Sequence, residues 1–179
     1  MVLLGSNSAF IMHNLCMNAD DDSPPTLDRI DRRILSVVQA NNLTPHREIA
    51  DKVGLSTPAV TRRLQRLRKS GLIQQDVSVL DAAALGRPLT IIAQVSLRSE
   101  QLADIDALRE SFRRCPQVQH CYYVTGEADF ILVLNVSDMA EYEELTRTLF
   151  FGSGNVKRFS TSVAMETVKA HSQVMLQGS

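Results

Sequence analysis

The chain has 179 residues, of which 44% are apolar and 22% charged, and its formal net charge is −1. This composition is typical of a globular protein with one large or two small domains, and it excludes wholesale disorder and a fibrous structure. The near-neutral charge excludes a uniformly basic coat for nucleic acid, although a single basic domain is still possible.

The cysteines and the apolar residues indicate the compartment. Three widely spaced cysteines form neither a disulfide framework nor a zinc-binding pattern. No apolar run reaches the roughly 18 residues that a membrane-spanning helix needs. We therefore expect a cytoplasmic protein that has no membrane partner, no metal and no cofactor.

Residues 1–25 differ from the rest of the chain. Residues 1–17 are moderately apolar, and an Asp-Asp-Asp-Ser-Pro-Pro run then ends the segment. A positive n-region and an A-x-A cleavage site, which a secretory signal needs, are both missing. We expect a flexible N-terminal extension, and Met12 and Met17 are alternative translation starts.

The charge divides the chain into two halves. Residues 26–76 hold ten Arg or Lys residues against five acidic ones, whereas residues 89–179 hold eight basic and eleven acidic residues. Such an asymmetry suggests two domains with different partners, and the basic half suggests nucleic acid.

Two helices are predicted at the start of the basic half. Apolar residues at helical spacing predict a helix over Leu27–Ala40. Thr44 as N-cap, with Pro45 at the first helical position, predicts a second helix over about His46–Val53. Gly54 is expected to end it, because glycine adopts a positive φ without strain.

A third, arginine-rich helix follows. Ser56 is expected to cap it, Pro58 lies in its first turn, and Gly71 ends it after about Ser70. Two short helices that are separated by a glycine turn, the second of them cationic, are typical of a helix-turn-helix. The first helix braces the second, which lies in the major groove of DNA.

The faces of this third helix predict its contacts. Val60, Leu64 and Leu67 form an inward stripe, and the opposite face is small and polar first and cationic later. The N-terminal residues of such a helix contact bases, and Arg62 could bind guanine through two hydrogen bonds. The cations later in the helix contact phosphates. A merely solvated basic face is the alternative. The DNA-binding candidates are Ser56, Thr57, Pro58, Thr61, Arg62, Arg63, Gln65, Arg66, Arg68 and Lys69.

The acidic half alternates strands and helices in the order β-α-β-β-α-β, the ferredoxin-like plan. The expected strands are Thr90–Leu97, Val118–Val124, Phe130–Val136 and Arg158–Met165, and the helices are Gln101–Arg114 and Met139 to about Phe150. The apolar residues Leu102, Ile105, Leu108 and Phe112 lie at helical spacing in the first helix. The residues expected to point inward from the second helix are Met139, Tyr142, Leu145 and Leu149.

This plan places both helices on one face of the sheet. The strand over Thr90–Leu97 carries apolar residues on both of its sides, so the other face also needs cover. A second copy of the chain is the cover that we expect, because helix-turn-helix proteins usually bind two half-sites as dimers.

The fold class is therefore α+β, with five expected segments. They are a flexible extension (1–25), a three-helix winged helix-turn-helix DNA-binding domain (26–76), a linker strand or extended linker (77–88), a ferredoxin-like βαββαβ sensing and oligomerisation domain (89–170) and a tail (171–179).

Several stretches resemble the Lrp/AsnC, or feast/famine, family of transcription regulators, over about Leu27 to Lys169. They are the residues LDRIDRRIL (27–35), EIADKVGLS (48–56), RLQRLRKSGLI (63–73), VTGEADF (124–130), Asp138-Met139 and Met165-Glu166. The resemblance implies a DNA-binding domain, a linker strand and a sensing domain that dimerises, often into octamers, and binds amino acids or related metabolites between subunits.

The resemblance also implies the effector site. Asp129 or Glu127 would accept hydrogen bonds from an effector ammonium group, and N–H groups around Gly126 would bind its carboxylate. An ordinary turn, with Met139 in the core, is the alternative. The candidates are Tyr123, Thr125, Gly126, Glu127, Ala128, Asp129, Met139, Ser162, Val163 and Ala164.

Two rival functions were weighed against a cytoplasmic regulator. An enzyme is disfavoured because the four histidines are isolated, and neighbouring His120 and Cys121 would point to opposite faces of a strand. A metabolite-binding oligomer without specific DNA binding is disfavoured by the basic third helix. We expect a regulator that binds double-stranded DNA and responds to a small molecule, with an amino acid as the expected effector.

Overall fold

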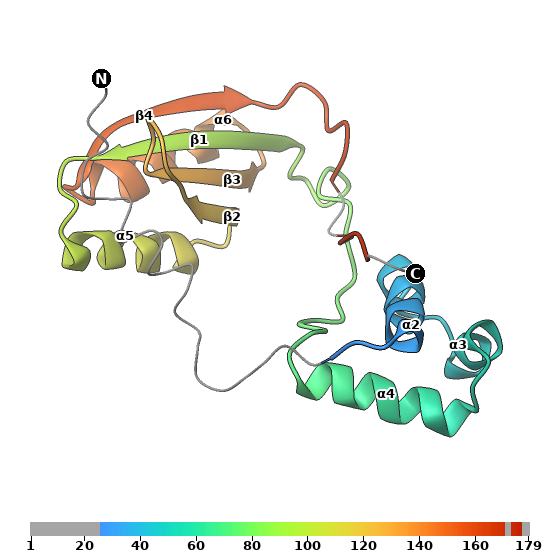
Figure 1. The fold of residues 1–179 in the computed structure, drawn as a ribbon. Helices are drawn as coiled ribbons and strands as arrows, with labels where there is room; N and C mark the ends of the chain where they lie inside the picture. The colour runs from blue at the N-terminus through green and yellow to red at the C-terminus, as the bar shows by residue number, and fades with distance from the viewer. Residues whose placement is uncertain (1–25, 171–172, 177–179) are drawn as a thin grey trace, which may run out of the picture. The chain divides into compact units, whose positions relative to one another are not determined.

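The computed structural model describes residues 26–170 and 173–176, and the chain divides into two compact units (Figure 1). One unit comprises residues 1–77 with 171–179, and the other comprises residues 78–170. The extension predicted over residues 1–25 lies outside the described residues, as does most of the predicted tail. In the described part, no helix is long and apolar enough to cross a membrane.

The first unit contains three helices, each within two residues of its predicted bounds. They are α2 (Arg29–Ala40), α3 (His46–Val53) and α4 (Thr57–Lys69). The inward stripe of α4 is confirmed, since Val60, Leu64 and Leu67 are buried. Ile34 of α2 and Ile49 of α3 complete the core of this unit.

The caps of α3 and α4 differ in part from the prediction. Gly54 ends α3 with a φ of +75°, as expected. Thr44 as N-cap was wrong: Pro45 occupies that position, and the Thr44 hydroxyl instead donates to the Asn41 carbonyl at 2.8 Å. Ser56 occupies the N-cap position of α4, but its side chain makes no capping hydrogen bond.

A buried carboxylate joins the start of α2 to α4. The Asp31 side chain is only 1% exposed and forms ion pairs with Arg63, at 2.8 Å, and with Arg66. Arg63 also pairs with Asp28 at 2.6 Å. Asp28 and Asp31 in turn form a capping box, in which each carboxylate accepts from the other residue's backbone N–H. This cluster fixes α4 against the N-terminus of α2.

We predict that Asp31→Ala destabilises the helical unit by roughly 2–4 kcal/mol, because it removes a buried charge partner and half of the capping box. Asp51→Ala, an exposed change on α3, is the control and should stay within about 0.5 kcal/mol. Urea unfolding followed by helical circular dichroism measures both. Equal stabilities of the two variants would contradict a structural role for Asp31.

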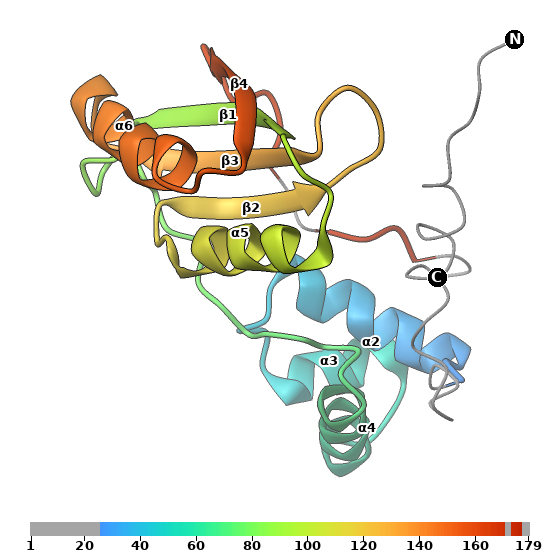
Figure 2. The ribbon, with the colours of Figure 1, turned by 90° about the vertical axis from the view of Figure 1, so that its left-hand side faces the viewer.

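The second unit is a four-stranded antiparallel sheet in the order β2-β3-β1-β4, which confirms the βαββαβ plan. Figure 1 shows β1 and β3 between the two edge strands, and Figure 2 shows α5 running beside β2. Its elements are β1 (Leu89–Leu97), α5 (Leu102–Arg114), β2 (Val118–Tyr123), β3 (Phe130–Val136), α6 (Met139–Thr146), the π-helix η1 (Arg147–Phe151) and β4 (Val156–Val163).

The helices cover one face of this sheet. Alternate residues of β1 and β3 are buried, and they pack with Phe112 of α5 and Phe150 of η1 in one core. Ile92 of β1 and Tyr122 of β2 lie on the open face, exposed by 37% and 53%. Val133 of β3 is paired with Ile92 on the same face and is half-buried. The open face is therefore partly apolar, as the sequence indicated.

Two apolar residues at the starts of helices are exposed. Leu102 and Met139 are 55% and 49% exposed, so the inward orientation expected for Met139 was wrong. Each is the first residue of its helix, and a helical side chain points back towards the N-terminus. Their side chains therefore extend beyond the covered part of the sheet.

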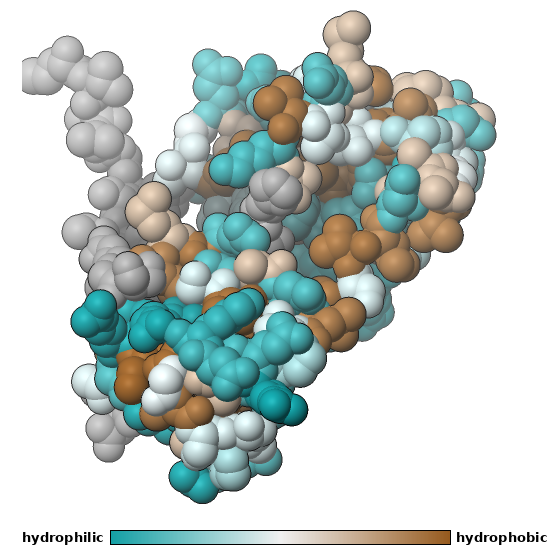
Figure 3. Space-filling view, turned by 90° about the vertical axis from the view of Figure 1, so that its right-hand side faces the viewer, coloured by the Kyte–Doolittle hydropathy of each residue, from teal (hydrophilic) through white to brown (hydrophobic). Residues whose placement is uncertain are grey.

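The linker is extended and contains no strand within this chain. Between Lys69 and Leu89 the described residues form no sheet pairing, and a turn lies at residues 82–86. Of a strand and an extended linker, the two structures that the sequence left open here, the described chain forms the extended linker, because it offers this segment no strand to pair with. Its apolar side chains are exposed, and Figure 3 shows hydrophobic groups (brown) at the surface among hydrophilic ones. The exposed residues are Val77, Val79, Leu80 and Leu85.

Glu141 anchors the start of α6. Its carboxylate accepts hydrogen bonds from the Ser137 N–H at 2.7 Å, from Gln117 at 2.9 Å and from Arg87 at 3.0 Å. These contacts, the backbone hydrogen bond from Ser137 foremost, lower the pKa of Glu141 to about 2. The ionised carboxylate thus joins the linker and the residue that precedes β2 to α6.

This shift predicts acid sensitivity of the second unit. The stabilisation from Glu141 is complete above its ordinary pKa of 4.5 and is lost as the pH falls towards about 2. Glu141→Gln should remove that part of the pH dependence between about pH 5 and pH 2. Tyrosine fluorescence during urea unfolding monitors this unit, because all three tyrosines lie in it. An unchanged pH profile in the variant would contradict the role of Glu141.

Candidate nucleic-acid interface and effector site

The helix α4 presents most of the predicted DNA contacts to solvent. Thr61 and Arg63 are half-buried, and the other eight candidates are exposed. The exposed set is Ser56, Thr57, Pro58, Arg62, Gln65, Arg66, Arg68 and Lys69.

Ion pairing divides the cations of α4 into two groups. Arg63 and Arg66 pair with the carboxylates at the start of α2, and Arg68 pairs with Asp76 at 2.8 Å. Hydrogen bonds to Asp28 and then to Asp31 raise the pKa of Arg63. Arg62 and Lys69 form no ion pair with any residue that the structure describes. Their charges are available to a phosphate or a base, whereas Arg63 is committed to the fold.

Thr61 also has an internal partner. Its hydroxyl lies 2.9 Å from Nδ1 of His46 and donates to the Thr57 carbonyl at 3.1 Å. The contact joins the two helices of the helix-turn-helix and orients the start of α4. A base contact by Thr61 would have to compete with these bonds.

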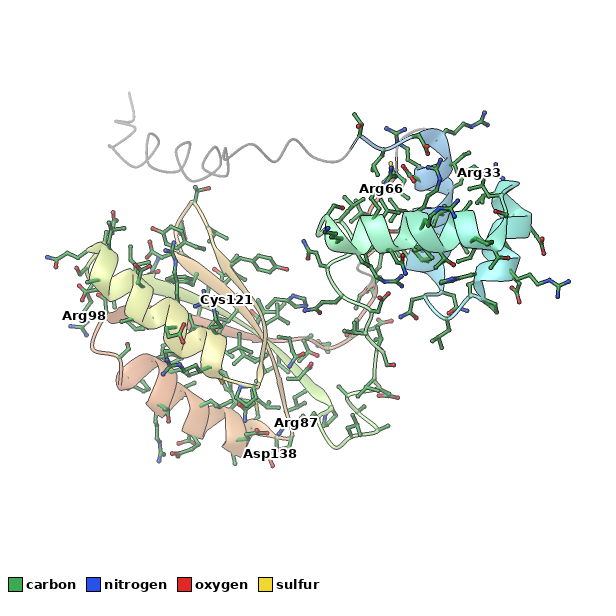
Figure 4. All side chains as sticks on the ribbon, turned by 90° about the horizontal axis from the view of Figure 1, so that it is seen from below. Arg33, Arg66, Arg87, Arg98, Cys121 and Asp138 are labelled. Atoms are coloured by element: carbon green, nitrogen blue, oxygen red, sulfur yellow. The ribbon has the colours of Figure 1, made fainter. Side chains whose placement is uncertain are left out.

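The sequence analysis did not single out Arg47, which lies at the start of α3 and is exposed. It forms no ion pair within the described part of the chain. The first helix of a helix-turn-helix crosses the DNA backbone. The position of Arg47 in this helix could therefore have identified it as a candidate phosphate contact. Arg33, labelled with Arg66 in Figure 4, instead donates to the Lys52 carbonyl at the end of α3.

Hydrogen bonds to β1 hold the predicted effector loop between β2 and β3. The Asp129 carboxylate accepts from the Leu97 N–H at 2.8 Å, and the Asp129 N–H donates to the Val95 carbonyl at 2.9 Å. Gly126 has a φ of +125°, which favours glycine at the tip. One oxygen of Asp129 is thus used by the fold, while Glu127 is exposed and remains available to an ammonium group.

Tyr123 lies on the helix-covered side of the sheet. Its ring packs 5.0 Å from that of Phe130, and the Arg109 guanidinium lies 4.9 Å above it. Burial, together with the charges of Asp129 and Glu100, raises its pKa. Tyr123 therefore helps to hold the loop in place from the helix-covered side of the sheet.

The ten effector candidates lie at two opposite ends of the sheet. Val163 pairs with Ile91 near the start of β1, whereas Phe130, next to the loop, pairs with Val95. Four strand residues separate these positions, roughly 13 Å at about 3.3 Å per residue. Figure 4 labels Asp138, which precedes Met139, and Arg98, which follows the end of β1, towards opposite ends of the sheet. One chain does not bring residues 123–129 together with Met139 and residues 162–164.

Comparison with known proteins identifies the two units. Residues 27–74 match the model of a winged helix-turn-helix DNA-binding domain, and residues 90–174 match that of the Lrp/AsnC ligand binding domain. The chain belongs to the Lrp/AsnC family. It is a DNA-binding transcription regulator with a ligand-binding domain. The prediction of a regulator is therefore confirmed, and the alternative of an enzyme is not supported.

Two relatives are similar along nearly their whole length. An uncharacterised HTH-type transcriptional regulator of Sinorhizobium fredii is 45% identical over 161 residues, which cover 89% of this chain and 95% of the relative. The leucine-responsive regulatory protein of Haemophilus influenzae is 31% identical, over 84% of this chain and 91% of its own.

Solved structures share the fold. An AsnC family regulator of Agrobacterium tumefaciens has a TM-score of 0.79 at 27% identity and covers 83% of this chain and 97% of its own. A transcriptional regulator of Neisseria meningitidis, solved as a complex with L-Met, has a TM-score of 0.80 at 26% identity and covers 85% and 98%.

The ion pairing of α4 predicts how its arginines differ on mutation. Arg62→Ala should weaken DNA binding about tenfold without changing the unfolding midpoint, because Arg62 has no described partner in the protein. Arg63→Ala should lower both DNA affinity and stability. Arg113→Ala on α5 is the control and should change neither. Fluorescence anisotropy with labelled DNA, beside urea unfolding, measures these effects. A loss of stability in Arg62→Ala would contradict the division of the α4 cations into those paired within the fold and those available to DNA.

Proposed function

We propose that this regulator binds DNA as an assembly of at least two copies and responds to an amino acid bound between copies. The observation that supports this proposal most directly is that the effector candidates lie at the two opposite ends of one sheet. A pocket that uses both groups needs the loop over residues 123–129 from one copy and residues 162–164 from another. The relative solved with L-Met supports an amino acid as the ligand class.

The open face of the sheet supplies the pairing surface. Ile92, Val133 and Tyr122 place apolar groups there, and a second sheet packed against them would remove these groups from water. The pairing gives two α4 helices, as binding to two half-sites requires. Larger assemblies such as octamers follow if the dimers associate further.

Within this proposal the loop binds the amino acid through complementary charges. The exposed Glu127 carboxylate accepts from the ammonium group, and backbone N–H groups around Gly126 bind the carboxylate. The proposed DNA contacts are made first by Arg62 and Lys69, with the exposed side of Arg66 adding a phosphate contact. The regulator acts in the cytoplasm, where its DNA lies.

We predict that the purified protein retains a small set of genomic fragments at about 150 mM salt, a concentration that screens weak surface contacts. An amino-acid pool should change that retention, because effector and DNA binding are coupled through the assembly. Glu127→Gln should keep the fragments and lose the amino-acid response, and Glu143→Gln on α6 is the matched control.

Each outcome of this experiment has one meaning. Retention no greater than that of random DNA would contradict specific binding and favour a metabolite-binding oligomer. A full response in Glu127→Gln would contradict the assigned role of the loop.

A further inference from the structure

Four cations of the ligand-binding unit form no ion pair with a described residue, and three of them, Arg98, Lys157 and Arg158, lie close together. The other arginines of this unit, on the linker, α5 and η1, all form ion pairs with Asp or Glu. Arg98, Lys157 and Arg158 form none with any described residue, although acidic residues outnumber basic ones in this half of the chain. Their positive charge is therefore not neutralised within the described part of the protein.

These three cations line one hollow. It has a volume of about 310 Å³ and lies between the end of β1, the end of η1 and the start of β4. Internal bonds fix the two arginine stems: Nε of Arg98 donates to the Val156 carbonyl at 3.1 Å, and Nε of Arg158 donates to the Ser96 hydroxyl at 3.3 Å. The terminal guanidinium nitrogens of both arginines have no hydrogen-bond partner among the described residues.

The same hollow has an aromatic wall. Phe151 is 70% exposed, and its ring meets that of Phe159 edge to face at 5.6 Å. Phe150 packs behind Phe159 at 4.6 Å and joins this wall to the core. The hollow is thus lined both by an exposed ring and by cations, which offer a ligand an apolar contact and an anion contact.

No acidic side chain lines the hollow. A free amino acid would therefore place its ammonium group beside three cations, which is unfavourable. A carboxylate without an ammonium group avoids this repulsion, and a planar guanidinium matches its two oxygens. A site of this size fits a small molecule of about ten heavy atoms.

We propose that this hollow binds small carboxylates that have an apolar or aromatic body and no ammonium group, the class to which 2-oxo acids belong. The site is separate from the effector loop, because none of residues 123–129 lines it. The regulator thus distinguishes an amino acid from the corresponding ammonium-free acid at two different places.

The test uses two compounds that differ only in the ammonium group, 3-phenylpropanoate and L-phenylalanine. Isothermal titration calorimetry on the full chain measures both, with Glu127→Gln as the background so that the effector loop does not contribute. We expect 3-phenylpropanoate to bind about tenfold or more tightly than L-phenylalanine.

Variants locate the binding. Arg158→Gln and Phe151→Ser should each weaken 3-phenylpropanoate binding about tenfold, because one removes a guanidinium and the other the ring. Lys169→Gln, which removes a cation outside the hollow, is the control and should bind like the parent. Circular dichroism verifies that each variant is folded.

Three outcomes would overturn the proposal. They are no binding of 3-phenylpropanoate, equal binding of the two compounds, and binding that survives both Arg158→Gln and Phe151→Ser. The proposed function would stand in each case, because it is measured by the amino-acid response of DNA binding and by Glu127.

Discussion

The sheet of the ligand-binding unit has helices on only one of its faces, and the proposed behaviour depends on this asymmetry. The covered face holds a continuous core that includes Phe112, Phe130 and Phe150. The open face leaves Ile92 and its neighbours on β2 and β3 at the surface. Apolar groups in such a position favour association, because packing removes them from water. A second copy would also supply the second α4 helix and the missing half of the effector site. Under the proposed pairing, one chain is half of the unit that binds DNA and the effector.

In the helical unit, the buried Asp31 determines which cations of α4 are paired within the fold and which are available to a ligand. A carboxylate inside a protein must be paired, and here Arg63 and Arg66 from α4 provide the charge. The helix therefore uses part of its positive charge to fix its own position, and Arg62 and Lys69, which have no described acidic partner, are the cations proposed to contact DNA. Net charge on a helix surface consequently overestimates the charge available to a ligand. The same consideration, applied to the second unit, separates the paired arginines of α5 from the unpaired Arg98 and Arg158.

The sequence predicted the elements and their order well, because each depends on local periodicity. The stripes of α4 and the alternation of β3 follow directly from spacing. Contacts between distant residues were not accessible in this way. The pairing of Arg63 with Asp31, 32 positions away in the sequence, gives a predicted phosphate contact a structural role as well. The bond from the Leu97 N–H to Asp129 similarly assigned a predicted ligand contact partly to the fold. The inward orientation expected for Met139 was wrong because periodicity does not show where the covered surface ends.

The most direct measurement of the central claim is the solution mass of a variant altered on the open face. Val133→Lys places a charge in the middle of that face, whereas Thr148→Lys places the same charge on the exposed surface of η1. Sedimentation equilibrium should give wild type and Thr148→Lys at least twice the 19.9 kDa of one chain, and Val133→Lys close to 19.9 kDa. An assembly that survives Val133→Lys unchanged, or a wild-type monomer at micromolar concentration, would contradict pairing through the sheet.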